Sequence, residues 1–380
     1  MMGARSLGLY LHIPFCSAIC NYCNFNRGLY DETLKWRYVA ALTQEIRRAG
    51  CDKPASTADT IYFGGGTPSL LEPKEATSLI DACRTSFAMP ADGEITMEAN
   101  PETVTPERLS AFRAAGVNRL SFGVQSFRDD ELKRLSRLHD ATRARTAYRW
   151  ARQAGFENVS LDLMMWLPGQ GLSQCLESVD VLIDLAPDHA SLYLLELYPH
   201  APLREEMTRT GQTLAPDDEA AEMYVAAMER LDGAGYAQYE ISNVARPGRR
   251  ARHNLKYWTD GEWLGFGCGA HSTREGVRWK NVSGTDEYIR RVTEGTSVVS
   301  ERRVLPPSTQ LEEALFMGLR LSDGVDLDLI AGRYGVDVWQ RYGSALQPHL
   351  EAGLLRKESS RLWLTRQGML LSHEVMAVFV

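Results

Sequence analysis

The stretch Tyr10-Leu-His-Ile-Pro-Phe-Cys16-Ser-Ala-Ile-Cys20-Asn-Tyr-Cys23 places three thiols in a CxxxCxxC spacing on one short loop after an apolar strand. Three thiolates on one loop indicate a metal site. A cubane iron–sulfur cluster normally takes four cysteine ligands, so three leave one iron free to bind the amino and carboxylate groups of a small molecule. Zinc is a weaker interpretation, because structural zinc needs four nitrogen or sulfur ligands in short paired spacings and His12 lies on the preceding strand. Three buried, unligated cysteines are the remaining alternative.

The size and composition of the chain favour a globular protein with one large and one smaller domain. The chain has 380 residues, of which 44% are hydrophobic and 24% charged. No apolar run approaches the roughly 18 residues that a membrane span needs, and the first residues are too short and polar for a signal peptide. The seven scattered cysteines do not resemble a disulfide framework, so we expect a cytoplasmic protein. The net charge of -7 argues against binding to nucleic acid.

From Leu7 to about Leu197, apolar strands alternate with amphipathic helices, a pattern typical of parallel βα units. We expect strands at 8–13, 60–63, 94–98, 119–123, 160–165 and 191–195. The expected helices are 33–48, 73–87, 105–115, 129–138, 141–154 and 173–185, several of them ending at a glycine: Gly50, Gly116 and Gly155. Six units instead of eight predict an α/β fold over residues 1–200, an incomplete, open-sided (βα)6 barrel.

Polar residues fall where the expected strands end. In parallel barrels the carboxyl ends of the strands converge on one mouth, where the chemistry takes place. After the first five strands come, in order, the cysteine loop, Gly64-Gly-Gly-Thr-Pro68, Glu98-Ala-Asn-Pro101, Gln125 and Asp162. This regular placement predicts a single functional site at the mouth of the barrel.

The pattern changes beyond residue 200. A helix at 217–232 and the aromatic, glycine-rich tract 236–272 predict a linker helix and a cap over the open barrel within residues 201–305. Pro306-Pro307 marks a boundary. Beyond it, expected helices at 310–321, 327–334 and 338–350 and a strand at 361–365 predict a small winged-helix-like α+β module over residues 306–380. This module lacks a marked basic face, so we expect a packing or partner role instead of DNA binding.

Several motifs together resemble the radical S-adenosylmethionine (SAM) superfamily, within it the branch of the oxygen-independent coproporphyrinogen III oxidases and the haem chaperone HemW family. The resemblance extends over nearly the whole chain. Its most specific segments are Tyr10-Leu-His-Ile-Pro-Phe-Cys16, Phe63-Gly-Gly-Gly-Thr-Pro-Ser69, Met97-Glu-Ala-Asn-Pro101, Ser121-Phe-Gly-Val-Gln-Ser-Phe127, Asp162-Leu-Met164 and Leu167-Pro-Gly-Gln170.

This resemblance implies a [4Fe-4S] cluster on Cys16, Cys20 and Cys23, with SAM bound at the remaining iron. The positions that it implies for SAM contacts are Tyr10, Tyr22, Gly65, Gly66, Thr67, Glu98, Gln125, Arg137 and Asp162. Glycine suits the turn physically, because a side chain there would block close approach to the backbone. The turn is no P-loop, since no GK[ST] follows it. No catalytic residue is assigned.

One departure separates the two branches. The oxidases carry a further cysteine two residues beyond the third ligand, whereas this chain has Cys23-Asn-Phe25. Only 15 residues precede Cys16, whereas the oxidases carry a longer N-terminal segment that helps to hold substrate. Both differences favour the haem chaperone.

The segment His253-Asn-Leu-Lys-Tyr-Trp258 matches the HNxxYW signature of the chaperone group. It offers an imidazole for axial iron ligation and flat aromatic surface for a macrocycle, so we expect His253, Tyr257 and Trp258 at a haem site. The alternative is that His253 is a hydrogen-bonded core residue. Competing iron ligands are Cys268 and His271, and the arginines available to pair with haem propionates are Arg249, Arg250 and Arg252.

We therefore expect a haem chaperone that delivers haem to an acceptor, for example a respiratory protein, and carries a SAM-bound cluster that gates transfer. The alternative is a coproporphyrinogen III oxidase that decarboxylates propionates through a radical, so enzyme activity stays open. A regulatory iron–sulfur protein that signals through the C-terminal module is a third hypothesis. The expected partners are haem and a haem-accepting protein, without nucleic acid and without a membrane span.

Overall fold

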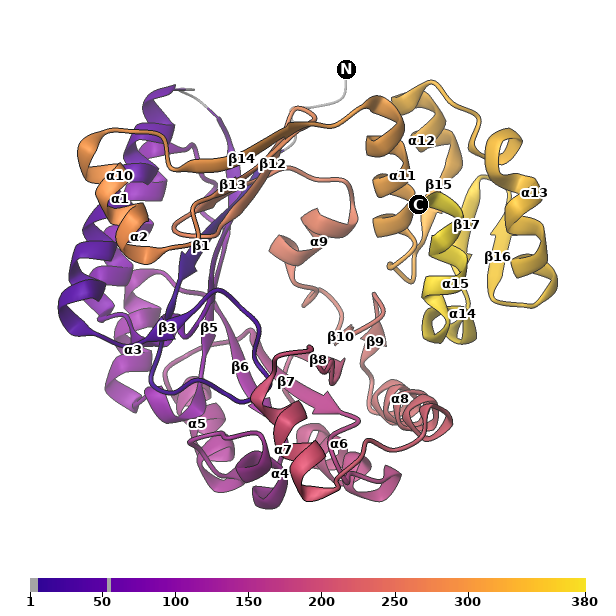
Figure 1. Cartoon of the computed structure of the whole chain (residues 1–380), viewed down its shortest axis with the longest axis horizontal. Coiled ribbons are helices and arrows are strands. Elements are labelled where there is room, and N and C mark those ends of the chain that lie inside the picture. The colour runs from indigo at the N-terminus through magenta and orange to yellow at the C-terminus, as the bar shows by residue number, and fades with distance from the viewer. Residues whose placement is uncertain (1–5, 53–55) are drawn as a thin grey trace.

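One open sheet organises most of the chain. The computed structural model describes residues 6–52 and 56–380. The sheet has 12 strands in the order β14-β13-β12-β11-β1-β4-β5-β6-β7-β8-β10-β9, and helices cover its outer side (Figure 1). The strands from β11 to β8 in this order run parallel to their neighbours, whereas those at both edges are antiparallel.

The six expected strands are confirmed as neighbours in one parallel sheet. They are β1 (Leu7–Ile13), β4 (Ala58–Gly65), β5 (Glu94–Ala99), β6 (Arg119–Gln125), β7 (Val159–Met165) and β8 (His189–Leu194). The helices that connect them are α1 (Glu32–Asp52), α2 (Pro73–Ser86), α3 (Pro106–Ala115), α4 (Asp129–Arg134), α5 (Ala141–Gln153) and α6 (Leu172–Leu185). Every residue of β1 except Tyr10 is buried, as is usual for a parallel strand covered on both faces.

Local sequence explains most helix ends. The Thr105 hydroxyl accepts a hydrogen bond from the Arg108 backbone N–H at the start of α3, and Gly116 ends this helix with φ 108°, as predicted. The expected end at Gly50 is wrong, because α1 continues to Asp52. A Cβ atom on Gly50 would lie 2.5 Å from the Cβ of Ser86. Gly50 is therefore needed for the close contact between α1 and α2.

The region expected to form a cap adds strands to both edges of the sheet. Next to β8 lie β10 (Asn243–Ala245) and β9 (Ala237–Gln238), and next to β1 lie β11 (Trp263–Phe266), β12 (His271–Arg274), β13 (Val277–Asn281) and β14 (Val299–Val304). The helices of this region are α7 (Pro202–Thr210), α8 (Asp217–Gly233), α9 (Arg252–Trp258) and α10 (Thr285–Glu294). The sheet thus extends well beyond the six predicted units.

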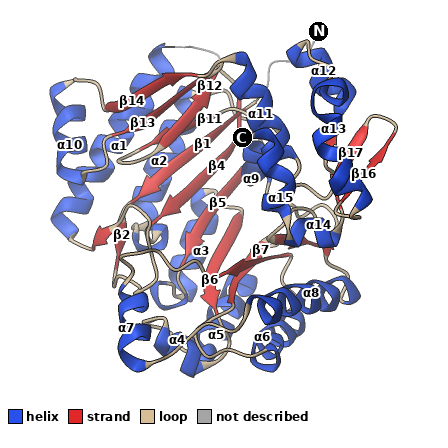
Figure 2. Cartoon of the chain, turned by 45° about the vertical axis from the view of Figure 1, so that its right-hand side comes forward, coloured by secondary structure: helices blue, strands red, loops and turns tan. Residues whose placement is uncertain are grey.

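The C-terminal part has a hydrophobic core of its own and lies beside α9 (Figure 2). Its helices are α11 (Pro307–Gly318), α12 (Leu327–Tyr334), α13 (Val338–Glu351), α14 (Arg366–Leu370) and α15 (Ser372–Met376), and its sheet holds β15 (Val325–Asp326), β17 (Arg361–Leu364) and β16 (Leu355–Glu358) in that order. The Arg320 guanidinium lies over the Trp258 ring, 4.4 Å from its centroid, and Arg333 pairs with Asp260. Within residues 6–52 and 56–380, no helix is long and apolar enough to cross a bilayer.

The contact between α1 and α2 yields a stability prediction. Gly50→Ala places a methyl group against Ser86 and should destabilise the protein by about 1–3 kcal/mol, because backbone atoms of Ser86 lie within 3 Å of it. Gly233→Ala is the matched control, since a Cβ there meets no atom within 4 Å. Thermal unfolding followed by circular dichroism should show a lower Tm for Gly50→Ala alone; equal Tm values for the two variants would contradict the packing argument.

Candidate functional site

The cysteine loop is held over the carboxyl edge of the sheet by backbone contacts. Short strands β2 (Phe15–Cys16) and β3 (Gly28–Leu29) pair within it. The Gly66 N–H donates to the Ile13 carbonyl at 2.8 Å, and the Thr67 N–H donates to the Phe15 carbonyl at 2.8 Å. A Cβ atom on Gly66 would lie 2.7 Å from the Phe15 carbonyl and 3.0 Å from the Cys16 Sγ. Glycine is therefore required where the second strand end meets the cysteine loop.

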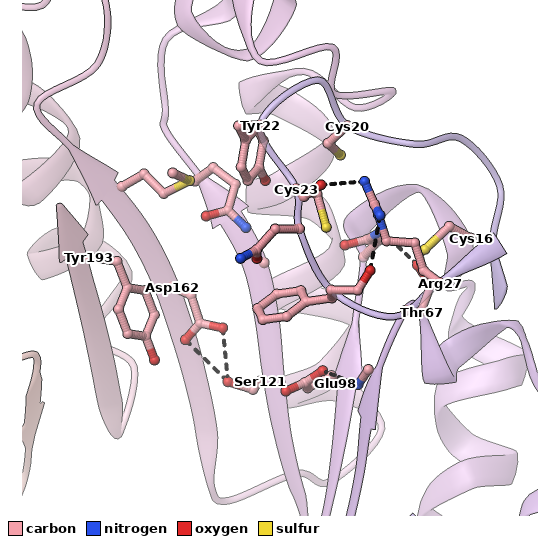
Figure 3. Close-up of a pocket in the computed structure, with 18 of the residues that line it drawn as sticks. Cys16, Cys20, Tyr22, Cys23, Arg27, Thr67, Glu98, Ser121, Asp162 and Tyr193 are labelled. Atoms are coloured by element: carbon pink, nitrogen blue, oxygen red, sulfur yellow. Dashed lines mark hydrogen bonds between the residues drawn. The ribbon is translucent and has the colours of Figure 1, made fainter. Parts of the chain in front are cut away.

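A cavity of about 380 Å³ opens beneath this loop (Figure 3). It brings together the three cysteines and all but one of the predicted SAM-contacting residues. Its walls include Cys16, Cys20, Tyr22, Cys23, Gly65, Gly66, Thr67, Glu98, Gln125, Arg137 and Asp162. The exception is Tyr10, whose hydroxyl lies 3.0 Å from the His12 Nδ1 and whose ring lines a second, adjoining cavity.

The thiols face polar and cationic groups. The Thr67 hydroxyl lies 3.5 Å from the Cys16 Sγ, and the Arg137 Nη1 lies 3.4 Å from the Cys20 Sγ. Burial raises the pKa of the Cys16 and Cys23 thiols, while the charge of Arg27 favours the thiolate of each. Among the described residues, no three His, Cys, Asp or Glu side chains converge on one point. A cubane needs no such convergence, because each thiolate binds a different iron, so the set fits a three-thiolate cluster.

Arg137 connects the cysteine loop with two strand ends. Its Nη2 donates to the Asn100 side-chain carbonyl and to the Gly123 backbone carbonyl, each at 2.7 Å. The Asn100 amide in turn donates to the Thr67 hydroxyl at 3.2 Å. The buried Nε atoms of Arg137 and Arg119, two residues that line the cavity, have no hydrogen-bond partner within the described part of the chain. Such donors suit an anionic group of a bound ligand.

Two carboxylates line the cavity from neighbouring parts of the sheet. Glu98 accepts hydrogen bonds from the Tyr62 hydroxyl at 2.7 Å and from the Gly65 backbone at 3.2 Å. Burial raises the pKa of Glu98 to about 7. Asp162 accepts from the Ser121 hydroxyl at 3.1 Å, and burial raises its pKa too (Figure 3). These oxygens can accept hydrogen bonds from the hydroxyl or amino groups of a ligand.

Gln125 stands at the last position of β6 in a rarely used backbone conformation. Its φ is 69°, and the pairing of β6 with β7 shifts register between Gly123 and Gln125. A non-glycine residue in this region of φ carries local strain, which is common at functional sites. The irregularity places Gln125 at the wall of the cavity.

Some polar residues of the cavity wall were not predicted from the sequence. They are Arg27, Asn100, Arg119, Ser121 and Tyr193. Asn100 directly follows the third strand, so the strand-end rule could have marked it, whereas Ser121 is the third residue of β6 and lies outside that rule. No pattern in the sequence marks Arg27 or Tyr193.

The HNxxYW motif lies in α9, but His253 lines neither of the two cavities. Its side chain is completely buried, with the Nδ1 2.8 Å from the Thr60 hydroxyl and the Nε2 2.9 Å from the Tyr257 hydroxyl. Burial lowers the pKa of His253 to about 3. Iron ligation by His253 would require both hydrogen bonds to break. Of the three motif residues expected at haem, only Tyr257 lines one of the two cavities, and Trp258 packs against Arg320 instead.

The other predicted haem contacts fall in two places. The three arginines face carboxylates of the chain, because Arg249 lies 4.0 Å from Asp188, Arg250 2.7 Å from Asp323 and Arg252 3.6 Å from Asp59. None of these three arginines lines either of the two cavities. Cys268 is buried, with its Sγ 3.7 Å from the Thr285 hydroxyl, whereas His271 is exposed at the wall of the second cavity.

Glu98 generates a pH prediction. Because its folded-state pKa lies near 7, above the ordinary value of 4.5, the folded apoprotein binds more protons than the unfolded chain between about pH 5 and 7. The free energy of unfolding should therefore fall as the pH rises through this window. Glu98→Gln should remove up to about 3 kcal/mol of that fall in urea denaturation. Parallel pH curves for the two proteins would contradict the assignment.

Comparison with known proteins confirms the predicted fold and family. Residues 10–182 match the radical SAM superfamily model, and residues 305–371 match that of the HemN C-terminal domain. The solved structure of the Escherichia coli coproporphyrinogen III oxidase HemN, a radical SAM enzyme, superposes with a TM-score of 0.87 over 99% of this chain and 90% of its own, at 24% identity. At this level of sequence identity, the structural similarity shows a shared fold.

Two relatives match over almost their entire length. The haem chaperone HemW of Bacillus subtilis is 37% identical over 372 residues, which cover 98% of each chain. That of Mycobacterium tuberculosis is 36% identical over 387 residues, which cover 99% of this chain and 95% of the relative. This chain therefore belongs to the haem chaperone HemW family of the radical SAM superfamily.

Proposed function

We propose that this protein binds haem and transfers it to an acceptor protein, and that it carries a [4Fe-4S] cluster with an exchangeable SAM. The observation that carries the proposal is the near-full-length similarity to haem chaperones in a chain whose three loop cysteines line one cavity. Membership of the radical SAM superfamily supports both the [4Fe-4S] cluster and SAM as cofactors of this protein.

The residues of the first cavity have roles that follow from their chemistry. Cys16, Cys20 and Cys23 would hold three irons, and the fourth iron would be open to the amino and carboxylate groups of SAM, the source of radical chemistry in this superfamily. The cations Arg27 and Arg137 lie beside the thiols and favour their ionised form.

The remaining predicted SAM contacts supply shape and hydrogen bonds. Gly65 and Gly66 line the cavity without side chains, and Glu98 and Asp162 accept hydrogen bonds. The predicted set also includes Tyr22 and Gln125, which line the first cavity, and Tyr10, which lines the second.

A coproporphyrinogen III oxidase is the second candidate, because the sequence motifs resemble both branches of the superfamily and residues 305–371 match the HemN C-terminal domain. The cysteine loop argues against it, because Phe25 stands two residues beyond Cys23, where the oxidases carry a further cysteine. The Phe25 side chain is 65% exposed and lines both cavities. An apolar ring at this place suits contact with a flat hydrophobic ligand.

We place haem transfer in the cytoplasm, with an acceptor such as a respiratory protein. All seven cysteines carry free thiols in the structure, which fits a reducing compartment. The C-terminal module packs beside α9 through Arg320 and Arg333, so it is available to couple acceptor binding to the cavity region.

Removal of one proposed ligand tests the cluster. Cys20→Ala should abolish the broad visible absorption of the reconstituted cluster and lower the iron content, while circular dichroism stays that of a folded protein, because Cys20 is only partly buried in a surface loop. Cys51→Ala is the matched control, since Cys51 is exposed and lies outside both cavities. Intact cluster absorption in Cys20→Ala would remove this cysteine from the ligand set.

A parallel assay separates the two candidate functions. The anaerobically reconstituted protein is titrated with haem and, in a second sample, incubated with coproporphyrinogen III, SAM and a reductant. The proposal predicts stoichiometric haem uptake and no decarboxylated product. Turnover of coproporphyrinogen III would overturn the chaperone assignment in favour of the oxidase.

A further inference from the structure

The second cavity lies beside the first and has a different character. Its volume is about 580 Å³, within the range that holds a cofactor-sized ligand. The residues that line both cavities are Asn24, Phe25, Gly65, Glu98 and Tyr198. A ligand in the second cavity would therefore be separated from the cysteine-lined cavity only by this shared wall.

Aromatic rings form much of the second wall. Tyr257 and Trp263 meet edge to face, with ring centroids 4.7 Å apart at 89°. The Trp263 indole N–H donates to the His271 carbonyl at 3.0 Å, which holds the first residue of β12 beside this ring. Phe25 and Tyr198, both exposed, add to the same wall. Rings at fixed angles offer the flat apolar surface that a planar macrocycle needs.

Two histidines line this cavity, and they differ in the hydrogen bonds of their imidazole rings. His12 uses both nitrogens, with the Nδ1 3.0 Å from the Tyr10 hydroxyl and the Nε2 2.7 Å from the Asn26 carbonyl. His271 has no ring hydrogen bond within residues 6–52 and 56–380. Partial desolvation at the cavity wall and the nearby charge of Lys280 lower the pKa of the exposed His271 ring, so the ring is neutral near pH 7, the form that binds metals.

A cation stands next to His271 on the same face of the sheet. His271 of β12 pairs directly with Lys280 of β13, so their side chains project to the same side. Lys280 also lines the cavity, and its ammonium lies 4.0 Å from the largely exposed Glu301 carboxylate. This loose surface pair leaves the ammonium available to an anionic group of a ligand.

We propose that the second cavity is the haem site, with His271 as an axial ligand of the iron and Lys280 as the partner of a propionate. This assignment rests on the proposed function and names its binding site. The aromatic wall would contact the porphyrin, and Glu98 at the shared wall would lie between haem and the cluster cavity.

The HNxxYW motif then has a positioning role. His253 is fixed by Thr60 on β4, and through its Nε2 it holds the Tyr257 hydroxyl at 2.9 Å. Tyr257 supports Trp263, which is bonded to the backbone of His271. The motif thus shapes the aromatic corner of the cavity without touching the iron.

Spectroscopic haem titration of the full chain tests the ligand. The wild type should show the Soret band of a histidine-ligated haem. His271→Ala should shift this band and weaken binding by about tenfold or more, and added imidazole should restore the band position. The control His373→Ala changes an exposed histidine of α15 and should behave as the wild type. A wild-type spectrum and affinity in His271→Ala would overturn the assignment while leaving the proposed function intact; no haem uptake by the wild type would overturn both.

Lys280→Met tests the propionate contact separately. It should weaken haem binding about two- to fivefold, because one partly exposed ion pair is lost. The affinity for haem with esterified propionates should be the same for this variant and the wild type. An equal loss of affinity for both porphyrins would show that Lys280 acts by packing and would contradict its assigned role.

Discussion

Two backbone hydrogen bonds, from Gly66 and Thr67 to the carbonyls of Ile13 and Phe15, hold the cysteine loop to the carboxyl edge of the sheet. The loop is also supported by the short β2–β3 pairing and at Asn21, whose carbonyl accepts a hydrogen bond from the Leu203 N–H at 3.0 Å and whose side-chain amide donates to the Arg134 carbonyl at 2.9 Å, but it meets the sheet edge through Gly66 and Thr67. The contact is so close that only glycine fits at position 66, where a Cβ would meet both Phe15 and Cys16. The arrangement of thiols, cations and carboxylates around the cavity follows from this one junction between two strand ends.

Much of the first site could be predicted from the sequence, because parallel strands converge at one edge. Glu98, Gln125 and Asp162 lie on three different strands, yet all line the same cavity. The rule works for Glu98 and Gln125, which stand at or beside the last residue of their strands, because strands buried on both faces are strongly apolar and polar residues begin where they end. The expectation that Asp162 follows its strand is wrong, because Asp162 lies in the middle of β7 and lines the cavity from there. Asn100 was within reach of the same rule.

The features that could not be predicted from the sequence depend on contacts between residues far apart in the chain. Strands β11–β14 extend the sheet beside β1, but their sequences are short and irregular, so the region was expected to be a cap. His253 is buried, and its ring forms a hydrogen bond with Thr60, which lies 193 positions away in the sequence. Gly50 resembles a helix end, and only the position of Ser86 on another helix shows that it serves packing.

The two cavities differ in the side chains that line them. One gathers thiols, guanidinium groups and carboxylates, whereas the other has aromatic walls and a free imidazole, and Glu98 and Phe25 belong to both. In α9, Tyr257 faces the second cavity while the next residue, Trp258, packs under Arg320 of the C-terminal module. This helix therefore lies between the proposed haem site and the C-terminal module.

We propose that three thiolates on the cysteine loop hold a cubane with one iron open to SAM. Electron paramagnetic resonance of the reduced, anaerobically reconstituted protein, recorded without and with SAM, tests it most directly. We expect a [4Fe-4S]⁺ signal whose g values change when SAM is added. A signal that SAM leaves unchanged, or protein that retains zinc in place of iron, would contradict it.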